Sequence, residues 1–322
     1  MSTPHALSTL IRCLTLAVGT LLLCLPVACS RAPAPEDDGQ LRVLVSIPPL
    51  IGLVEALAPE GSEVDVLIPA GEFVHGYQLR PDDRARVGRA DLVVMVGVGL
   101  EGGAASVLEG AGDRLVRFDR VAGIEDDGHD HAHDHDHDHG GTTDPHLWLD
   151  FELVPLLINE LERRLGALPG VDRAALSERA LALRARVRAL DEEHRERLSS
   201  VRGQAIVTHH DAWSRLADRF GLRVVGVLRP VVSGEPTPAE LAEARRAIES
   251  EGVRAIFVEP QMDATLATRL ARNAGVRVGV LDPMGSGDWF AMMRQNLDVL
   301  VDGLGEPGAP TLPEPERTPE GP

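Results

Sequence analysis

The body of this 322-residue chain contains no cysteine. All three cysteines, Cys13, Cys24 and Cys29, lie inside or at the end of one apolar stretch near the N-terminus. The folded part can therefore form neither disulfides nor thiolate metal sites. The chain also lacks lysine, and its 32 basic residues against 50 acidic residues give a formal net charge of −18. Such an acidic balance argues against nucleic acid as a partner, because phosphates require a basic surface.

The apolar stretch at residues 13–28 is too short for a transmembrane helix and ends in small residues, which is typical of a secretory signal peptide. We therefore expect residues 1–29 to be a signal peptide and the protein to work outside the cytoplasmic membrane. Residues 27–30, Val-Ala-Cys-Ser, resemble a bacterial lipoprotein cleavage box with Cys29 as the lipidated residue. Pro26 stands where leucine is usual, so lipidation and plain signal cleavage both stay open.

From residue 41 onward, short β-branched runs alternate with amphipathic stretches. The strands are predicted at 41–46, 64–68, 91–96, 115–118, 204–208, 224–227, 255–258 and 276–281. The helices are predicted at 50–58, 82–88, 152–165, 211–220, 238–251, 264–273 and 289–300. This alternation indicates an α/β protein with parallel sheets and helices on both faces.

One segment, at 172–202, has helical periodicity without any strand. It begins at Asp172, a good N-cap, and stops at Gly203. A helix of this length spans on the order of 40 Å, more than a crossover inside one domain needs. We expect it to join an N-terminal lobe at 41–171 to a C-terminal lobe at 203–304. Residues 30–40 are predicted to be a flexible tether and residues 305–322, rich in Pro, Gly and Glu, a disordered tail.

Half of the twelve histidines lie in a tract that alternates histidine and aspartate within a predicted loop at 125–141. They are His129, His131, His133, His135, His137 and His139. Imidazole and carboxylate are common ligands of divalent metals, so the tract is interpreted as a multidentate metal-binding surface. An inert polar loop and an affinity tag are the alternatives, although a tag would stand at a terminus.

Four more histidines, His75, His146, His209 and His210, fall where loops are predicted, and Asp282 follows a predicted strand. Open α/β sheets bind ligands at the carboxyl ends of their strands, where these loops converge. Taken singly, a loop histidine is more often a surface residue, and an aspartate before proline is commonly a turn former. Residues from both halves that converge would suit a tetrahedral ion. His194 lies on the apolar stripe of the long helix and is interpreted as a packed histidine.

Several segments carry a resemblance to a known family. They are GEFVHGYQLRPDD at 71–83, VGVGLEGG at 96–103, DPHLWLD at 144–150, THHDAWSRLADRFGL at 208–222, GEPTPAEL at 234–241, FVEPQMDATLATRLAR at 257–272 and VLDPMG at 280–285. The chain resembles the cluster A-I solute-binding proteins of ABC importers, which capture zinc or manganese outside the membrane. The resemblance implies two α/β lobes joined by one long helix, with the metal in the cleft between them.

The resemblance also implies a ligand set. His75, His146 and His210 match the three histidine ligands of the family, and Asp282 matches the acidic fourth ligand of some members. His209 then becomes a neighbour of the site. Some zinc members carry an acidic residue before the first histidine, where this chain has Val74, so Asp282 or water is left for the fourth position.

Three imidazoles and one carboxylate suit Zn²⁺, whereas Mn²⁺ prefers more oxygen ligands, so we expect a zinc-binding member, with a manganese-binding member as the alternative. The expected protein is a monomer that is not an enzyme. It would work in the periplasm or on the extracellular face of the membrane and serve an ABC importer permease. A periplasmic metallochaperone is a further partner to consider, and the His/Asp tract would collect zinc weakly. Because ligating imidazoles must be neutral, affinity is expected to fall below about pH 6.

Two other functional classes stay open from the sequence. An extracytoplasmic zinc hydrolase would need an open coordination position and a general base, but no His-Glu-x-x-His motif appears and Asp282 would close the coordination sphere. A soluble metal buffer acting through the tract alone would not require His75 or His210.

Overall fold

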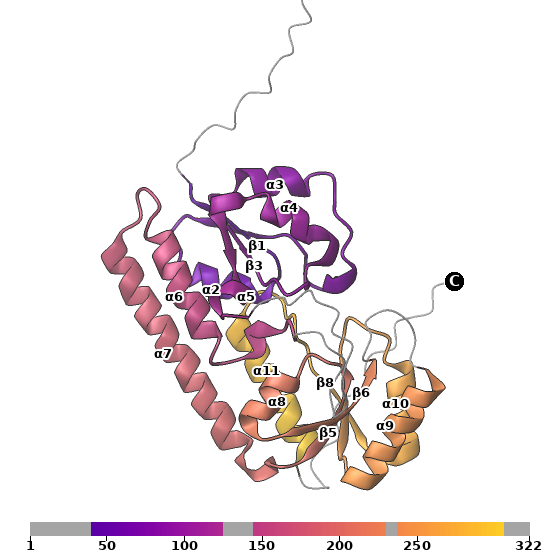
Figure 1. The fold of residues 1–322 in the computed structure, drawn as a ribbon. Helices are drawn as coiled ribbons and strands as arrows, with labels where there is room; N and C mark the ends of the chain where they lie inside the picture. The colour runs from indigo at the N-terminus through magenta and orange to yellow at the C-terminus, as the bar shows by residue number, and fades with distance from the viewer. Residues whose placement is uncertain (1–39, 125–143, 230–236, 306–322) are drawn as a thin grey trace, which may run out of the picture. The chain divides into compact units, whose positions relative to one another are not determined.

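Two four-stranded parallel sheets form the framework of the protein (Figure 1). The computed structural model describes residues 40–124, 144–229 and 237–305. The predicted signal peptide, the tether as far as Gly39, the tract with its six histidines, and the tail from residue 306 lie outside the described residues. From Gln40 onward, the chain forms one compact unit.

The first sheet has the strand order β2-β1-β3-β4, and the second repeats the pattern as β6-β5-β7-β8. The strands of the first are β1 (Arg42–Val45), β2 (Glu63–Val66), β3 (Leu92–Met95) and β4 (Leu115–Arg117). Those of the second are β5 (Ala205–His210), β6 (Arg223–Arg229), β7 (Ala255–Val258) and β8 (Arg277–Val280). All pairings are parallel, and β1 and β5 each pair with two neighbours. The eight predicted strands and the predicted fold class are confirmed.

Helices connect successive strands. In the first lobe they are α2 (Pro49–Glu55), α3 (Asp83–Arg89), α4 (Ala105–Glu109), α5 (Phe118–Val121) and α6 (Val154–Leu165). In the second they are α8 (Ser214–Phe220), α9 (Pro238–Glu251), α10 (Thr265–Ala274) and α11 (Trp289–Leu304). Five 3₁₀ turns occur in the described ranges: η1 (Val74–Gly76), η2 (Gly102–Ala104), η3 (Gly112–Arg114), η4 (Leu147–Leu149) and η5 (Ser199–Val201). No helix in these ranges has the length and apolar character to cross a bilayer.

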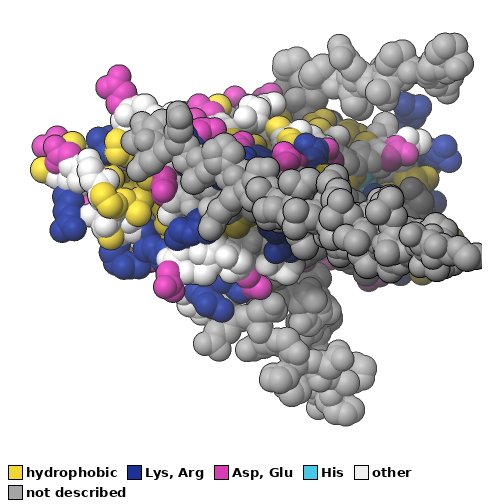
Figure 2. All heavy atoms as spheres, turned by 90° about the horizontal axis from the view of Figure 1, so that it is seen from above, with side chains coloured by type: hydrophobic (Ala, Val, Ile, Leu, Met, Phe, Trp, Pro, Cys, Tyr) yellow, Lys and Arg dark blue, Asp and Glu magenta, His cyan; other side chains and the backbone are white. Residues whose placement is uncertain are grey.

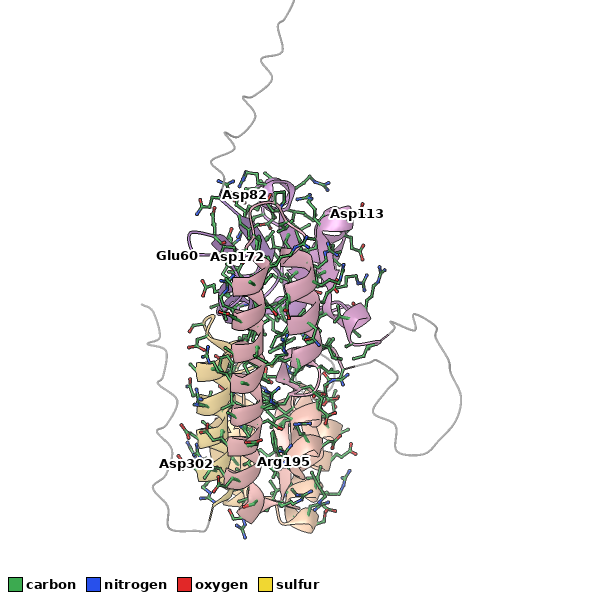
Figure 3. The ribbon with its side chains drawn as sticks, turned by 90° about the vertical axis from the view of Figure 1, so that its left-hand side faces the viewer. Glu60, Asp82, Asp113, Asp172, Arg195 and Asp302 are labelled. Atoms are coloured by element: carbon green, nitrogen blue, oxygen red, sulfur yellow. The ribbon has the colours of Figure 1, made fainter. Side chains whose placement is uncertain are left out.

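The long helix α7 (Arg173–Arg197) packs against α6 and α11 (Figure 3). Its N-cap is Asp172, whose Oδ1 accepts hydrogen bonds from Ala174 N at 2.9 Å and Ala175 N at 3.2 Å. The helix ends before the predicted boundary, because the chain tightens into η5 after Leu198. The interpretation of His194 as a packed residue is confirmed: its side chain is fully buried, and its Nδ1 lies 2.8 Å from Leu190 O.

One apolar core runs without interruption from the first sheet through α7 to Trp289 and Phe257. Two indole hydrogen bonds reinforce it: Trp148 Nε1 donates to Pro283 O at 2.6 Å, and Trp289 Nε1 donates to Trp148 O at 2.8 Å. Because the interior is close-packed across both lobes, a large rotation of one lobe against the other would break this core.

Arginine and acidic side chains lie interspersed among the described residues on the face that Figure 2 shows. This distribution differs from the continuous basic surface that binds nucleic acid.

Candidate metal centre

Three histidines from different parts of the chain meet at the carboxyl edges of the two sheets. One nitrogen of each of His75, His146 and His210 lies within 4.8 Å of the corresponding nitrogens of the other two. The ring centroids are 5.9 Å apart for His75 and His146, 5.8 Å for His75 and His210, and 4.9 Å for His146 and His210. The structure therefore brings together three of the four residues that the sequence singled out, while their binding of an ion stays a prediction.

Each histidine is held by a different kind of local structure. His75 lies in η1, and the turn η2 approaches it so closely that a Cβ on Gly102, at φ +46°, would lie 3.1 Å from His75 O. His146 is the N-cap of η4. His210 is the last residue of β5, a central strand. Strand β5 thus runs two residues beyond the end of the predicted strand 204–208. The expectation that His209 and His210 lie in a loop is wrong, because both belong to β5, and His210 pairs with Arg229 of β6.

The orientation of His146 is fixed by Asp144. The Nδ1 atom of His146 lies 2.8 Å from Asp144 Oδ1, and the backbone N of His146 donates to the same oxygen at 2.9 Å. Arg215 Nε lies 3.3 Å from Asp144 Oδ2. Burial alone would raise the pKa of Asp144, but its contacts with His146 and the positive charge of Arg215 keep it below its usual value. Asp144 is therefore ionised and holds the imidazole by Nδ1, which leaves Nε2 available.

Glu259 holds His210 in the same way. The Nδ1 atom of His210 lies 2.9 Å from Glu259 Oε1, and Trp213 Nε1 donates to this oxygen at 3.2 Å. Glu259 is only 3% exposed. A carboxylate on one imidazole nitrogen selects the tautomer whose other nitrogen can bind a metal, an arrangement common around protein-bound zinc.

His75 completes the group with a nitrogen for which the described residues offer no competing partner. Its Nε2 is buried and neither accepts nor donates a hydrogen bond within the described part of the chain. Burial and then the nearby His146 and His210 lower the pKa of His75 to about 3. The imidazole is therefore neutral near pH 7, as a metal ligand must be.

The three imidazoles line a cavity together with Glu259, Gln261 and other side chains. Its volume is about 20 Å³, enough for one water-sized species. A buried imidazole nitrogen without a partner in a cavity of this size fits a single metal ion bound by nitrogen donors.

Asp282 does not join the group. Its Oδ1 accepts hydrogen bonds from Gln261 Nε2 at 2.7 Å and from Met284 N at 2.9 Å. Within the described ranges, the cluster of potential ligands contains no carboxylate. The role of Asp282 as the fourth ligand stays a prediction, and in the structure its side chain accepts hydrogen bonds from Gln261 and Met284 instead.

His209 stands beside the site, as expected for a neighbour. It is 2% exposed, and burial lowers its pKa. Successive residues of a strand point to opposite faces, so His209 and His210 cannot both face the cavity.

The sequence reasoning missed Glu259 and Gln261, and it gave Asp144 no role of its own. Glu259 directly follows β7, so the same argument from strand ends that selected His210 would have found it. Asp144 stands two residues before His146, a spacing that lets a carboxylate reach back to an imidazole.

Comparison with known proteins identifies the family of the chain. A model of the family described as zinc-uptake complex component A, periplasmic, matches residues 43–303. The high-affinity zinc uptake system protein ZnuA of Haemophilus ducreyi is 30% identical over 269 residues, which cover 76% of this chain and 85% of the relative. The zinc-binding lipoprotein AdcA of Streptococcus pneumoniae serotype 4 is 26% identical over 319 residues. That match covers 94% of this chain but only 63% of the streptococcal protein.

The fold is also similar to that of solved structures. The periplasmic zinc-binding protein TroA from Treponema pallidum superposes with a TM-score of 0.71 at 22% identity, covering 83% of this chain and all of the other. The family expected from the sequence motifs is confirmed by the match over residues 43–303, and the chain belongs to the zinc-uptake complex component A family.

Proposed function

We propose that this chain is an extracytoplasmic solute-binding protein that captures Zn²⁺ and delivers it to the membrane permease of an ABC importer. The observation that supports the proposal most directly is the convergence of His75, His146 and His210 within 4.8 Å. Two of the imidazoles are held by carboxylates, the half-buried Asp144 and the buried Glu259, so little reorganisation is needed when an ion binds.

The donor set favours zinc over manganese. Three imidazole nitrogens suit zinc, whereas manganese is bound more often by carboxylates, carbonyls and water. Asp144 and Glu259, the carboxylates beside the imidazoles, each already contact a ring nitrogen, so neither adds an oxygen ligand of the kind that manganese prefers. Zn²⁺ is therefore the proposed cargo, with the family relatives named for zinc as additional support.

The site supports binding better than hydrolysis. A zinc hydrolase needs room for its substrate beside the ion and a free general base. Asp144 and Glu259, the carboxylates beside the imidazoles, each already contact a ring nitrogen, and the cluster of potential ligands among the described residues contains no further carboxylate that could act as a base. The proposed role is therefore transport, with no catalytic step.

Export through the predicted signal peptide, with or without a lipid on Cys29, would place the protein where a solute-binding protein works. The proposed partners are the importer permease and, for loading, a periplasmic metallochaperone. The tract from His129 to His139 is proposed as a weak zinc-collecting segment.

The test is zinc titration against a chromophoric chelator at pH 7, with His75→Ala, His146→Ala and His210→Ala beside the wild type. The matched control is His209→Ala, which removes the adjacent buried histidine. We expect each of the three site variants to lose the tight site and the control to keep it. Tight binding that survives all three substitutions would refute the proposal. Accumulation of radioactive zinc by cells that depend on this protein should fail with the same three variants.

A further inference from the structure

The side chain of Gln261 lies in the wall of the cavity that His75, His146 and His210 line. Its Oε1 is buried and finds no hydrogen-bond partner among the described residues. A buried carbonyl oxygen without a partner costs free energy, and such atoms in native structures call for a ligand or an ordered solvent molecule. Gln261 lies three residues after the end of β7 and two residues after Glu259, so the same segment supplies both side chains.

The direction of the Gln261 amide is fixed by Asp282. Gln261 Nε2 donates to Asp282 Oδ1 at 2.7 Å. Turning the amide over would place its oxygen against the Asp282 carboxylate, so Oε1 must point away from Asp282. The geometry of this pair therefore leaves the amide oxygen, and not the amide nitrogen, available to a ligand.

Asp282 is in turn held by the backbone and by α11. Its Oδ1 also accepts a hydrogen bond from Met284 N at 2.9 Å. Asn296, which is buried on α11, accepts from Asp282 N at 2.9 Å and donates to Asp282 O at 2.8 Å. Because three hydrogen bonds anchor this residue, it provides a rigid support for Gln261.

Among the described residues that line the cavity, two carry a buried side-chain atom without a hydrogen-bond partner: His75, at Nε2, and Gln261, at Oε1. A tetrahedral zinc ion takes four ligands, and the three imidazoles supply three. We propose that Gln261 Oε1 is the oxygen that completes the coordination of the ion, and that Asp282 acts through Gln261 as a positioning residue. This inference rests on the proposed zinc-binding function and deepens it.

The proposal changes the expected consequences of substitution. Gln261→Met keeps the length of the side chain and removes the oxygen. Gln261→Glu keeps an oxygen at the same place, and Asp282→Asn keeps an acceptor for Gln261 Nε2. The matched control is Gln78→Met, which makes the same change on an exposed side chain of the loop that carries His75.

The experiment measures zinc affinity by chelator competition at pH 7 and the visible absorption of the Co²⁺-loaded protein. We expect Gln261→Met to weaken zinc binding by about 10–100-fold, the range found when a supporting group of a metal site is removed. Asp282→Asn should weaken it less, and Gln261→Glu should bind more tightly than Gln261→Met. The cobalt bands should shift in Gln261→Met and stay unchanged in Gln78→Met.

A loss of less than about tenfold in Gln261→Met, or an unchanged cobalt spectrum, would overturn the assignment. So would a larger loss in Asp282→Asn than in Gln261→Met, since Asp282 would then contact the ion itself. Absence of tight zinc binding in the wild type would instead refute the proposed function, and the two failures are therefore distinguishable.

Discussion

The Nδ1 atom of His210 and the Oε1 atom of Glu259 lie 2.9 Å apart, although 49 residues separate them in the chain. One comes from the end of β5 and the other from the segment after β7, which are neighbouring strands of the second sheet. The sheet therefore provides the proposed ligand and the carboxylate that orients it as one unit.

Glu259→Gln should weaken zinc binding by about 10–100-fold at pH 7, because the neutral amide holds the His210 tautomer less firmly and makes its Nε2 less basic. The measurement is chelator competition. Glu251→Gln is the control, since Glu251 pairs with Arg223 on the surface. Equal affinities for Glu259→Gln and the control would show that the contact with His210 has no role in metal binding.

The metal-free protein should lose stability in acid because of His75. Its pKa is 6.5 in the unfolded chain and about 3 in the folded protein, since burial and the neighbouring imidazoles disfavour its charged form. Between these two values only the unfolded chain binds this proton. The contribution of His75 to the free energy of unfolding is therefore fully present above pH 6.5 and is lost as the pH falls toward 3.

The slope from this one group is at most about 1.4 kcal/mol per pH unit, reduced by solvent screening. Urea unfolding with a chelator at pH 7, 6 and 5 measures it, and His75→Gln should have a shallower slope than the wild type. Other buried histidines contribute to both proteins and cancel in the difference. Parallel pH profiles for the two proteins would contradict the pKa assigned to His75.

Zinc binding should leave the arrangement of the lobes nearly unchanged. The continuous core and the two indole hydrogen bonds of Trp148 and Trp289 tie the lobes together beside the site. Small-angle scattering should give the same radius of gyration with and without zinc. A clear compaction on loading would mean that this core opens in the metal-free protein.

The close contact between α2 and the segment before α11 should be sensitive to a single added methyl group. Gly52 N donates to Gly287 O at 2.9 Å, and a Cβ on Gly52 would lie 2.8 Å from that oxygen. Gly52→Ala should therefore lower the free energy of unfolding by about 1–3 kcal/mol, the usual cost of overpacking. Gly88→Ala, where a Cβ meets no atom within 4 Å, is the control for urea unfolding. Equal stability of the two variants would rule out a tight contact at Gly52.

Deletion of residues 128–141 should remove the weak zinc sites and slow the acquisition of zinc from chelators, while the tight site persists. Isothermal titration separates the two classes of site. Loss of the tight site in the deletion variant would contradict the proposed division of roles.

The sequence predicts the strands well because each carries a buried β-branched run, and parallel strands leave a strong local signal. The short helices α4 and α5, of five and four residues, were not predicted, since they contain too few turns to show a period. His75, His146 and His210 converge because the strand ends and loops that carry them lie at the carboxyl edges of the sheets.

The hydrogen-bond partners of the site could not be predicted in the same way. Whether Asp282 faces an ion or Gln261 depends on a side-chain rotamer and on Asn296 from a distant helix, and no local pattern encodes such a contact. Motif matching assigned Asp282 by position alone and therefore could not detect its contact with Gln261.

X-ray absorption at the zinc edge of the loaded protein tests the central claim most directly. We expect three imidazole nitrogens at about 2.0–2.1 Å from one zinc ion in the wild type, and loss of this three-imidazole signature in the His75→Ala variant. A wild-type spectrum with fewer than three imidazoles, or one that His75→Ala leaves unchanged, would contradict the account.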